Sequence, residues 1–176
     1  MTQFDEITET ALGNFGLVTA AQAKELGIRS KDIAEWVRLG RMERLGWGVY
    51  RIAHYAPSEF DRYAEAVAIV GEGAVVFGDS VLAMLNLALV NPLRVSVATG
   101  RRVRRRLPEW IRLVKLPKGE ETGNIEGVPC QSLAGAIRAC RGRVMAERLA
   151  EAVREAGRKG WLGADEAEAL EREVAL

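Results

Sequence analysis

The stretch "TAAQAKELGIRSKDIAEWVRLGRMERLGWGVYRI", residues 19–52, decides the fold of the N-terminal part of the chain. Thr19 is the predicted N-cap of a short helix that stops at Gly27, and Ser30 is the predicted N-cap of a second helix that stops at Gly40. The apolar stripe expected to be buried by the second helix is Ile33, Trp36 and Val37. The break "GIR" between the two helices is short and contains glycine, as the turn of a helix-turn-helix requires.

A hairpin is predicted directly after these helices. "MERL" and "GVYRI" are strand-like, and the wing tip, Gly46-Trp47-Gly48, supplies the backbone freedom that a tight turn needs. Upstream, "FDEITETALGNFG" spaces its apolar residues at helical intervals and predicts one more helix. Three helices followed by a hairpin indicate a winged helix-turn-helix, and a purely structural three-helix module with the same hairpin is the alternative.

The rest of the chain mixes helices and strands. The fold class predicted is α+β, with a winged helix-turn-helix at residues 1–57 and a mixed α+β domain at residues 58–176. The predicted helices are "DRYAEAVAIVG", "DSVLAMLNLALV" with Asp79 as N-cap, "LAGAIRACRG", "RVMAERLAEAVREAGRKG" and "ADEAEALEREVAL". The predicted strands are "LRVSVATG", "WIRLVKLP" and a hairpin in "GNIEGVPCQS" that turns at Gly127, and "GAVVFG" is either a short strand or a turn. The basic "RRVRRR" is expected to form a hairpin loop or a strand edge.

Composition indicates an ordinary globular protein without a membrane segment. The chain has 176 residues, a net charge of +1, 48% hydrophobic and 28% charged residues. The acidic start "MTQFDEITET" lacks the basic region of a secretory signal, and the apolar runs are too short to span a bilayer. These features predict a cytoplasmic protein, in which Cys130 and Cys140 are reduced thiols.

Catalytic and metal chemistry find little support in the residues. His54 is the only histidine, the spacing of the two cysteines does not match a structural zinc site, and the phosphate-binding loop pattern is missing. An acidic residue two positions before a lysine, a common metal-nuclease pattern, occurs before none of the five lysines. We therefore expect a protein that is not an enzyme and that has no catalytic residue, no metal site and no cofactor.

Basic residues around the predicted helix-turn-helix favour nucleic-acid binding instead. A recognition helix presents residues near its N-terminus to base edges, while basic groups on the helix and the wing contact phosphates. The candidate DNA-binding residues are Arg29, Ser30, Lys31, Arg38, Arg41, Arg44 and Trp47. Two residues have two possible roles each. Glu35 either accepts a hydrogen bond from cytosine or only solubilises the surface. Trp47 either packs under the second domain or lies against DNA.

A second basic patch lies in the C-terminal half. It consists of Arg101, Arg102, Arg104, Arg105 and Arg106, five arginines in six positions. Because clustered like charges repel one another, a polyanionic partner is favoured over a solvated loop. That partner is either DNA or an acidic protein surface.

The segments "GLVTAAQA", "LGIRSKDI", "VRLGRMERL" and "GVYRI" occur in this order and at close spacing between Gly16 and Ile52. In this order they resemble the N-terminal domain of the AbiE-type abortive-infection antitoxin family of type IV toxin-antitoxin systems. The resemblance continues more weakly through "GAVVFGDSVLAMLNL", "LRVSVATGRRVRRR" and "IEGVPCQSLAGAIRA", and departs from the family pattern at "QSLAGAI".

The resemblance implies a winged-helix domain that binds operator DNA and represses its own operon, and a C-terminal domain that counteracts a nucleotidyltransferase-like toxin. The partners implied are operator DNA and that toxin, whether contacted directly or only functionally. Two alternatives stay open at this point. One is a non-enzymatic interaction module that uses the arginine cluster and the acidic last helix, and the other is a stand-alone winged-helix regulator.

Overall fold

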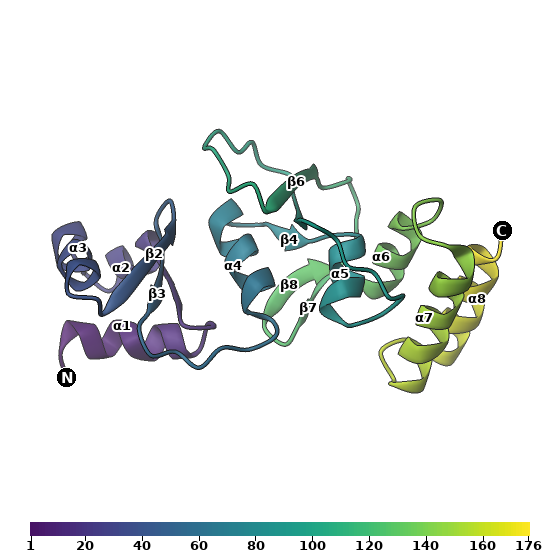
Figure 1. Cartoon of the computed structure of the whole chain (residues 1–176), viewed down its shortest axis with the longest axis horizontal. Helices are drawn as coiled ribbons and strands as arrows, with labels where there is room; N and C mark the ends of the chain where they lie inside the picture. The colour runs from purple at the N-terminus through teal and green to yellow at the C-terminus, as the bar shows by residue number, and fades with distance from the viewer.

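The computed structural model describes all 176 residues and shows an elongated molecule. A winged-helix module forms one end, a five-stranded sheet with its helices forms the middle, and a pair of helices forms the C-terminal end (Figure 1). No helix has both the length and the apolar character needed to cross a membrane.

The N-terminal module has the element order of a winged helix. Its elements are α1 (Gln3–Leu12), β1 (Leu17–Thr19), α2 (Ala20–Glu25), α3 (Ser30–Arg38), β2 (Met42–Gly46) and β3 (Val49–Ile52). The three strands form an antiparallel sheet in the order β1-β3-β2. This confirms the predicted winged helix-turn-helix and adds β1, which was not predicted.

Local chemistry fixes the helix ends of this module. Thr19 caps α2 in a reciprocal box with Gln22, and Gly27 and Gly40 both have a φ of 71°, a left-handed conformation that glycine adopts without strain. The prediction that Ser30 is an N-cap is wrong by one residue. Arg29 holds that position, and its side chain binds Asp32 instead of capping the helix.

A small core holds the module together. It is formed by Ile7, Ala11, Val18, Ala23, Ile28, Ile33, Met42 and Ile52. Trp36 and Val37 are partly buried at its rim, and the Trp36 ring meets Phe4 edge to face at 5.1 Å between centroids. The predicted stripe of α3 therefore faces inward, and the rest of that helix faces solvent.

The C-terminal module is built on a mixed sheet. Its elements are α4 (Asp61–Val70), β4 (Val75–Val76), α5 (Asp79–Met84), β5 (Val95–Thr99), β6 (Ile111–Lys115), β7 (Thr122–Ile125), β8 (Val128–Gln131), α6 (Leu133–Ala139), α7 (Ala146–Arg158) and α8 (Ala164–Val174). The strand order is β6-β5-β4-β8-β7, with β5 parallel to β6 and β4 parallel to β8. Together the two modules confirm the α+β fold class.

Three local predictions in this module are corrected. Because β5 and β6 are parallel, residues 100–110 cross from one end of the sheet to the other, and "RRVRRR" is not a hairpin loop. The helix predicted to continue to Val90 ends at Met84, since Asn86, Ala88 and Leu89 all have positive φ angles. Gly78, not Asp79, is the N-cap of that helix.

The wing sheet packs directly on α4. Leu17 and Val49, from the small sheet, belong to the larger core of the C-terminal module, which also contains Ile69 of α4. A Cβ added to Gly46 would lie 3.1 Å from Ile69 Cγ1, so the strand and the helix are in close contact there. The placement of a domain boundary at residues 57 and 58 stays a prediction, because the larger core crosses it.

Candidate nucleic-acid interface

The exposed side of α3 carries four residues at helical spacing. This recognition face consists of Lys31, Ala34, Glu35 and Arg38, at positions i, i+3, i+4 and i+7, and all four are exposed. Ile33 is buried on the opposite side of the helix. The helix therefore presents one continuous mixed surface of charged and small apolar groups to the solvent.

Two ion pairs lie along α3. Arg29 donates to Asp32 at 2.8 Å, and Arg38 donates to Glu35 through both its Nε and its Nη2. These hydrogen bonds hold the pKa of Asp32 and of Glu35 below their usual values. Exposed pairs of this kind contribute little to stability, so both arginines can exchange their carboxylate for a phosphate or a base.

Lys31 differs from these arginines because it has no carboxylate partner within ion-pair distance. It lies in the first turn of α3 with Ser30 beside it, and both side chains are exposed. The free backbone N–H groups of a helix N-terminus favour negative charge. The first turn of α3 is thus electrostatically suited to an anionic partner.

The basic residues of the wing have mostly aromatic neighbours. The guanidinium of Arg41 lies 3.6 Å from the centre of the Phe4 ring, and that of Arg44 lies 6.0 Å from the centre of the Trp47 ring. Arg44 also donates to the carbonyl of Gly46 at 3.3 Å. These contacts leave the positive charge of both arginines without a carboxylate partner.

Trp47 is 71% exposed at the wing tip. The alternative in which it packs under the C-terminal module is therefore not what the structure shows. The indole instead borders a surface hollow, together with the end of α4 at Gly71 and with Arg101, Arg102 and Arg104. A second hollow joins it to Arg106 and Pro108.

The arginine loop, residues 101–106, thus lies beside the wing tip although the two are distant in the sequence (Figure 1). Its five arginines divide into two groups. Arg101 pairs with Glu72 at 3.0 Å, and Arg105 donates to the carbonyls of Ile69 and Val70 at the C-terminal end of α4. All five arginines are exposed, but Arg102, Arg104 and Arg106 have neither a carboxylate nor a carbonyl partner.

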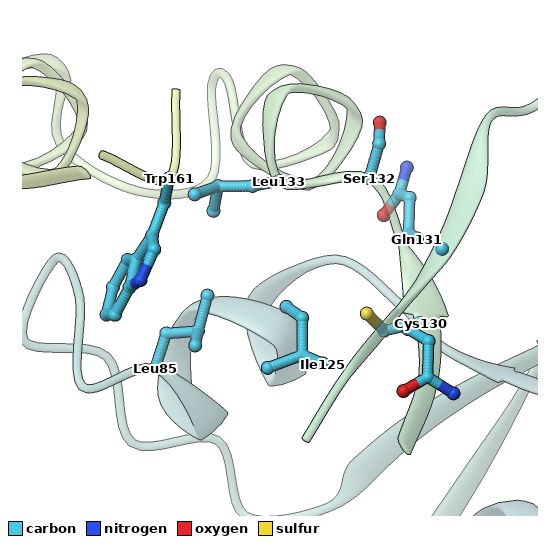
Figure 2. A pocket seen from close by; sticks show the side chains of 9 residues that line it. Leu85, Ile125, Cys130, Gln131, Ser132, Leu133 and Trp161 are labelled. Atoms are coloured by element: carbon cyan, nitrogen blue, oxygen red, sulfur yellow. The ribbon is translucent and has the colours of Figure 1, made fainter. Parts of the chain in front are cut away.

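An apolar pocket lies on another part of the C-terminal module, near α6 and the loop between α7 and α8. Figure 2 shows Trp161 and Leu85 toward one end of it and Cys130 and Gln131 toward the other. Its volume of 260 Å³ is just below the roughly 300–1,000 Å³ typical of small-molecule sites.

The polar groups of this pocket are already engaged or protonated. Burial raises the pKa of the Cys130 thiol to about 11. Gln131 accepts a hydrogen bond from the Gly78 N–H at 2.9 Å and donates one to Glu120 at 2.7 Å. The pocket therefore presents neither an activated nucleophile nor an acid and base pair. The chain also has no cluster of three or more His, Cys, Asp or Glu side chains placed to hold a metal ion.

Comparison with known proteins finds one family match, and it lies over the N-terminal module. Residues 5–53 match the family model described as "Transcriptional regulator, AbiEi antitoxin". This span runs from within α1 to the end of β3 and so covers every element of the winged helix.

The structure is also similar to a crystal structure of the RV2827C protein from Mycobacterium tuberculosis, with a TM-score of 0.48 and 15% sequence identity. That similarity covers 97% of this chain and 71% of the other. No curated protein matches the sequence.

Proposed function

We propose that the chain is a DNA-binding antitoxin, because residues 5–53 match the family model of the AbiEi antitoxin transcriptional regulators. It represses its own operon by binding operator DNA and counteracts a nucleotidyltransferase-like toxin. The observation that supports the DNA-binding role is the recognition face of α3, which is exposed beside Arg41 and Arg44, two arginines without a carboxylate partner.

In this proposal α3 enters the major groove. Arg29, Ser30 and Lys31 lie at its N-terminal end, where backbone N–H groups and positive side chains meet phosphates or base edges. Arg38 lies two turns further along the same helix. Arg41, just before β2, and Arg44 and Trp47 on the wing then contact the sugar-phosphate backbone.

The middle of the recognition face supplies base contacts of different kinds. Ala34 is small and apolar and suits the methyl group of thymine, whereas Glu35 can accept from cytosine and Arg38 can donate twice to guanine. The ion pair between Glu35 and Arg38 aligns both side chains in the free protein. A C·G base pair offers both groups their partners, and it is the pair we expect opposite this position.

A footprint of the purified protein on the DNA upstream of its own gene tests the proposal. The double variant Lys31→Ala with Arg38→Ala should weaken operator binding on the order of 10- to 100-fold. The matched control is Lys118→Ala with Arg148→Ala, which removes the same charge from exposed positions of the C-terminal module. If the double variant and its control have the same dissociation constant, α3 is not the recognition helix.

The antitoxin role has its own test. A gene directly downstream should encode a nucleotidyltransferase-like protein, and co-expression of this chain should restore growth of cells that express it. An isolated gene would favour a stand-alone winged-helix regulator, and binding to an acidic protein in the absence of DNA binding would favour an interaction module.

A further inference from the structure

We infer that the free edge of β7, together with the apolar pocket beside it, binds an extended segment of a protein partner that carries one apolar side chain between basic residues. The pocket is the one shown in Figure 2. The inference goes beyond the proposed function, because it adds a peptide-binding site in the C-terminal module that neither DNA binding nor repression requires.

The backbone of β7 is paired on one side only, since β7 is the last strand of the sheet. A two-residue turn makes Ile125 and Val128 a hydrogen-bonded pair, so the next pair, Asn124 with Pro129, is a non-hydrogen-bonded one. Pro129 has no N–H to donate, in agreement with this alternation. The N–H and C=O groups of Asn124, and of Thr122 two residues earlier, therefore point away from β8. Both residues are exposed, and the backbone of neither is hydrogen-bonded to a turn or loop.

This edge lacks the features that usually prevent pairing with another chain. Proteins block such edges with charged side chains or with a bulge. The sequence of β7 is Thr-Gly-Asn-Ile, without a charge, and its register with β8 is regular. The edge strand at the other end of the sheet, β6, carries Arg112 and Lys115. Of the two edges, β7 is therefore the one that is open to an added strand.

The apolar pocket opens beside the β7 edge. Gly123 and Ile125 line it, and Gly123 pairs with Cys130, which lines it as well. Figure 2 shows Ile125 between Cys130 at one end of the pocket and Leu85 with Trp161 at the other. A strand added to β7 projects alternate side chains toward this face. Because an apolar cavity of about 150 Å³ already holds benzene, the 260 Å³ here have room for a leucine or phenylalanine side chain.

The charges around the edge select a basic partner. Residues 118–128 contain three glutamates, Glu120, Glu121 and Glu126, and one lysine. The nearby Arg138 is already paired with Glu173 at 2.7 Å. That hydrogen bond raises the pKa of Arg138, and the charge of Glu121 raises it further, so Arg138 does not neutralise the glutamates. Lysine or arginine on both sides of the apolar side chain complements this negative charge.

Titration of the full chain with a short peptide tests the inference. The peptide acetyl-Lys-Val-Leu-Val-Lys-amide should shift the NMR signals of the Thr122 and Asn124 amides, and acetyl-Glu-Val-Leu-Val-Glu-amide should bind at least about tenfold more weakly. Two further lysine peptides are N-methylated at alternate residues, in opposite phases. Only one phase should abolish binding, because an added strand directs every second N–H toward its neighbour.

Charge reversal at the edge should invert the preference between the two peptides. Glu121→Lys with Glu126→Lys should weaken binding of the lysine peptide at least about tenfold and strengthen binding of the glutamate peptide. The matched control is Glu59→Lys with Glu109→Lys, which reverses two exposed glutamates away from β7.

Trp161→Ala tests the pocket separately from the charges. The side chain is 43% exposed, and its loss should weaken binding of the lysine peptide at least about tenfold. Leu93→Ala is the control, because Leu93 is 94% exposed and does not line the pocket.

Equal binding of the lysine and glutamate peptides, or equal binding of both methylated peptides, would overturn the inference. So would a dissociation constant above about 1 mM for the lysine peptide. Sedimentation of the chain alone tests a second copy as the occupant. If the chain self-associates and Glu121→Lys with Glu126→Lys abolishes the association, the edge binds another copy and the inference is refuted. A chain that stays monomeric and binds the lysine peptide at β7 supports it.

Discussion

Arg51 of β3 and Glu65 of α4 form an ion pair between the winged helix and the C-terminal module, with 3.2 Å between Nη1 and Oε2. Each side chain is only about one fifth exposed, at 20% and 19%. The Nε and Nη2 atoms of Arg51 are buried and have no hydrogen-bond partner within the protein. Glu65 is the only acidic side chain within 4 Å of this guanidinium, and the pair links β3 of the wing to α4.

We expect Glu65→Gln to destabilise the protein by about 1–3 kcal/mol, because a largely buried cation then loses its counter-charge. The free energy of unfolding from urea titration measures this loss. The appearance of two unfolding transitions in place of one would show in addition that the pair couples the modules.

Glu72→Gln is the matched control for that variant. It removes a carboxylate from the pair with Arg101, whose side chains are 65% and 81% exposed, and such pairs contribute little. If both variants unfold at the same urea concentration, the pair between Arg51 and Glu65 does not stabilise the fold.

Arg105 should behave differently from its neighbours in the arginine loop. Its guanidinium satisfies the carbonyls of Ile69 and Val70 at the end of α4, so Arg105→Ala should lower stability by about 1–2 kcal/mol. Thermal unfolding is the measurement, with Arg104→Ala as the control that removes the same charge from a free side chain. Arg105→Lys should recover little of the loss, because an ammonium cannot reproduce the forked geometry.

The winged helix could be predicted from the sequence because local chemistry encodes its helix ends. Thr19 with Gln22, and the left-handed Gly27 and Gly40, mark boundaries that do not depend on distant residues. The strand β1 was missed because three residues are too few to show alternation, and its identity depends on pairing with β3.

The path of the arginine loop, in contrast, could not be predicted from the sequence. Two strand-like segments joined by "RRVRRR" have the same pattern whether the chain reverses or crosses over, so the parallel pairing of β5 with β6 was not predictable. For the same reason, the sequence does not show which of the five arginines have partners within the protein and which have none. Arg105 donates hydrogen bonds to carbonyls of α4, which lie far away in the sequence.

The two cysteine thiols should react slowly with alkylating reagents in the folded protein. Cys130 and Cys140 are buried, and burial raises the pKa of each thiol to about 11. The reactive thiolate is therefore scarce at neutral pH, and iodoacetamide should label the native protein at least about 100-fold more slowly than the protein in urea. Fast labelling of either thiol at pH 7 would contradict this placement, and mass spectrometry after a timed quench separates the two sites.

A third contact between the modules is made by Phe15, which lies against Gly127 in the β7–β8 turn. The φ angles of Glu126 and Gly127 are 50° and 90°, as in the type I′ turn of a two-residue hairpin. A Cβ on Gly127 would lie 3.3 Å from Phe15 Cε2. Gly127→Ala should therefore cost about 1–2 kcal/mol for the left-handed backbone and a further increment for the contact with the ring.

Gly119→Ala is the control that separates these two terms. Gly119 has a φ of 74°, and nothing lies within 4 Å of the Cβ position, so its replacement incurs backbone strain alone. The additional loss in Gly127→Ala, measured as the free energy of unfolding, should disappear when Phe15→Ala is introduced into the same chain. If that double-mutant cycle shows no coupling, Phe15 does not fix the first turn of the winged helix to the sheet, and Arg51 with Glu65 and the packing on Ile69 carry the connection instead.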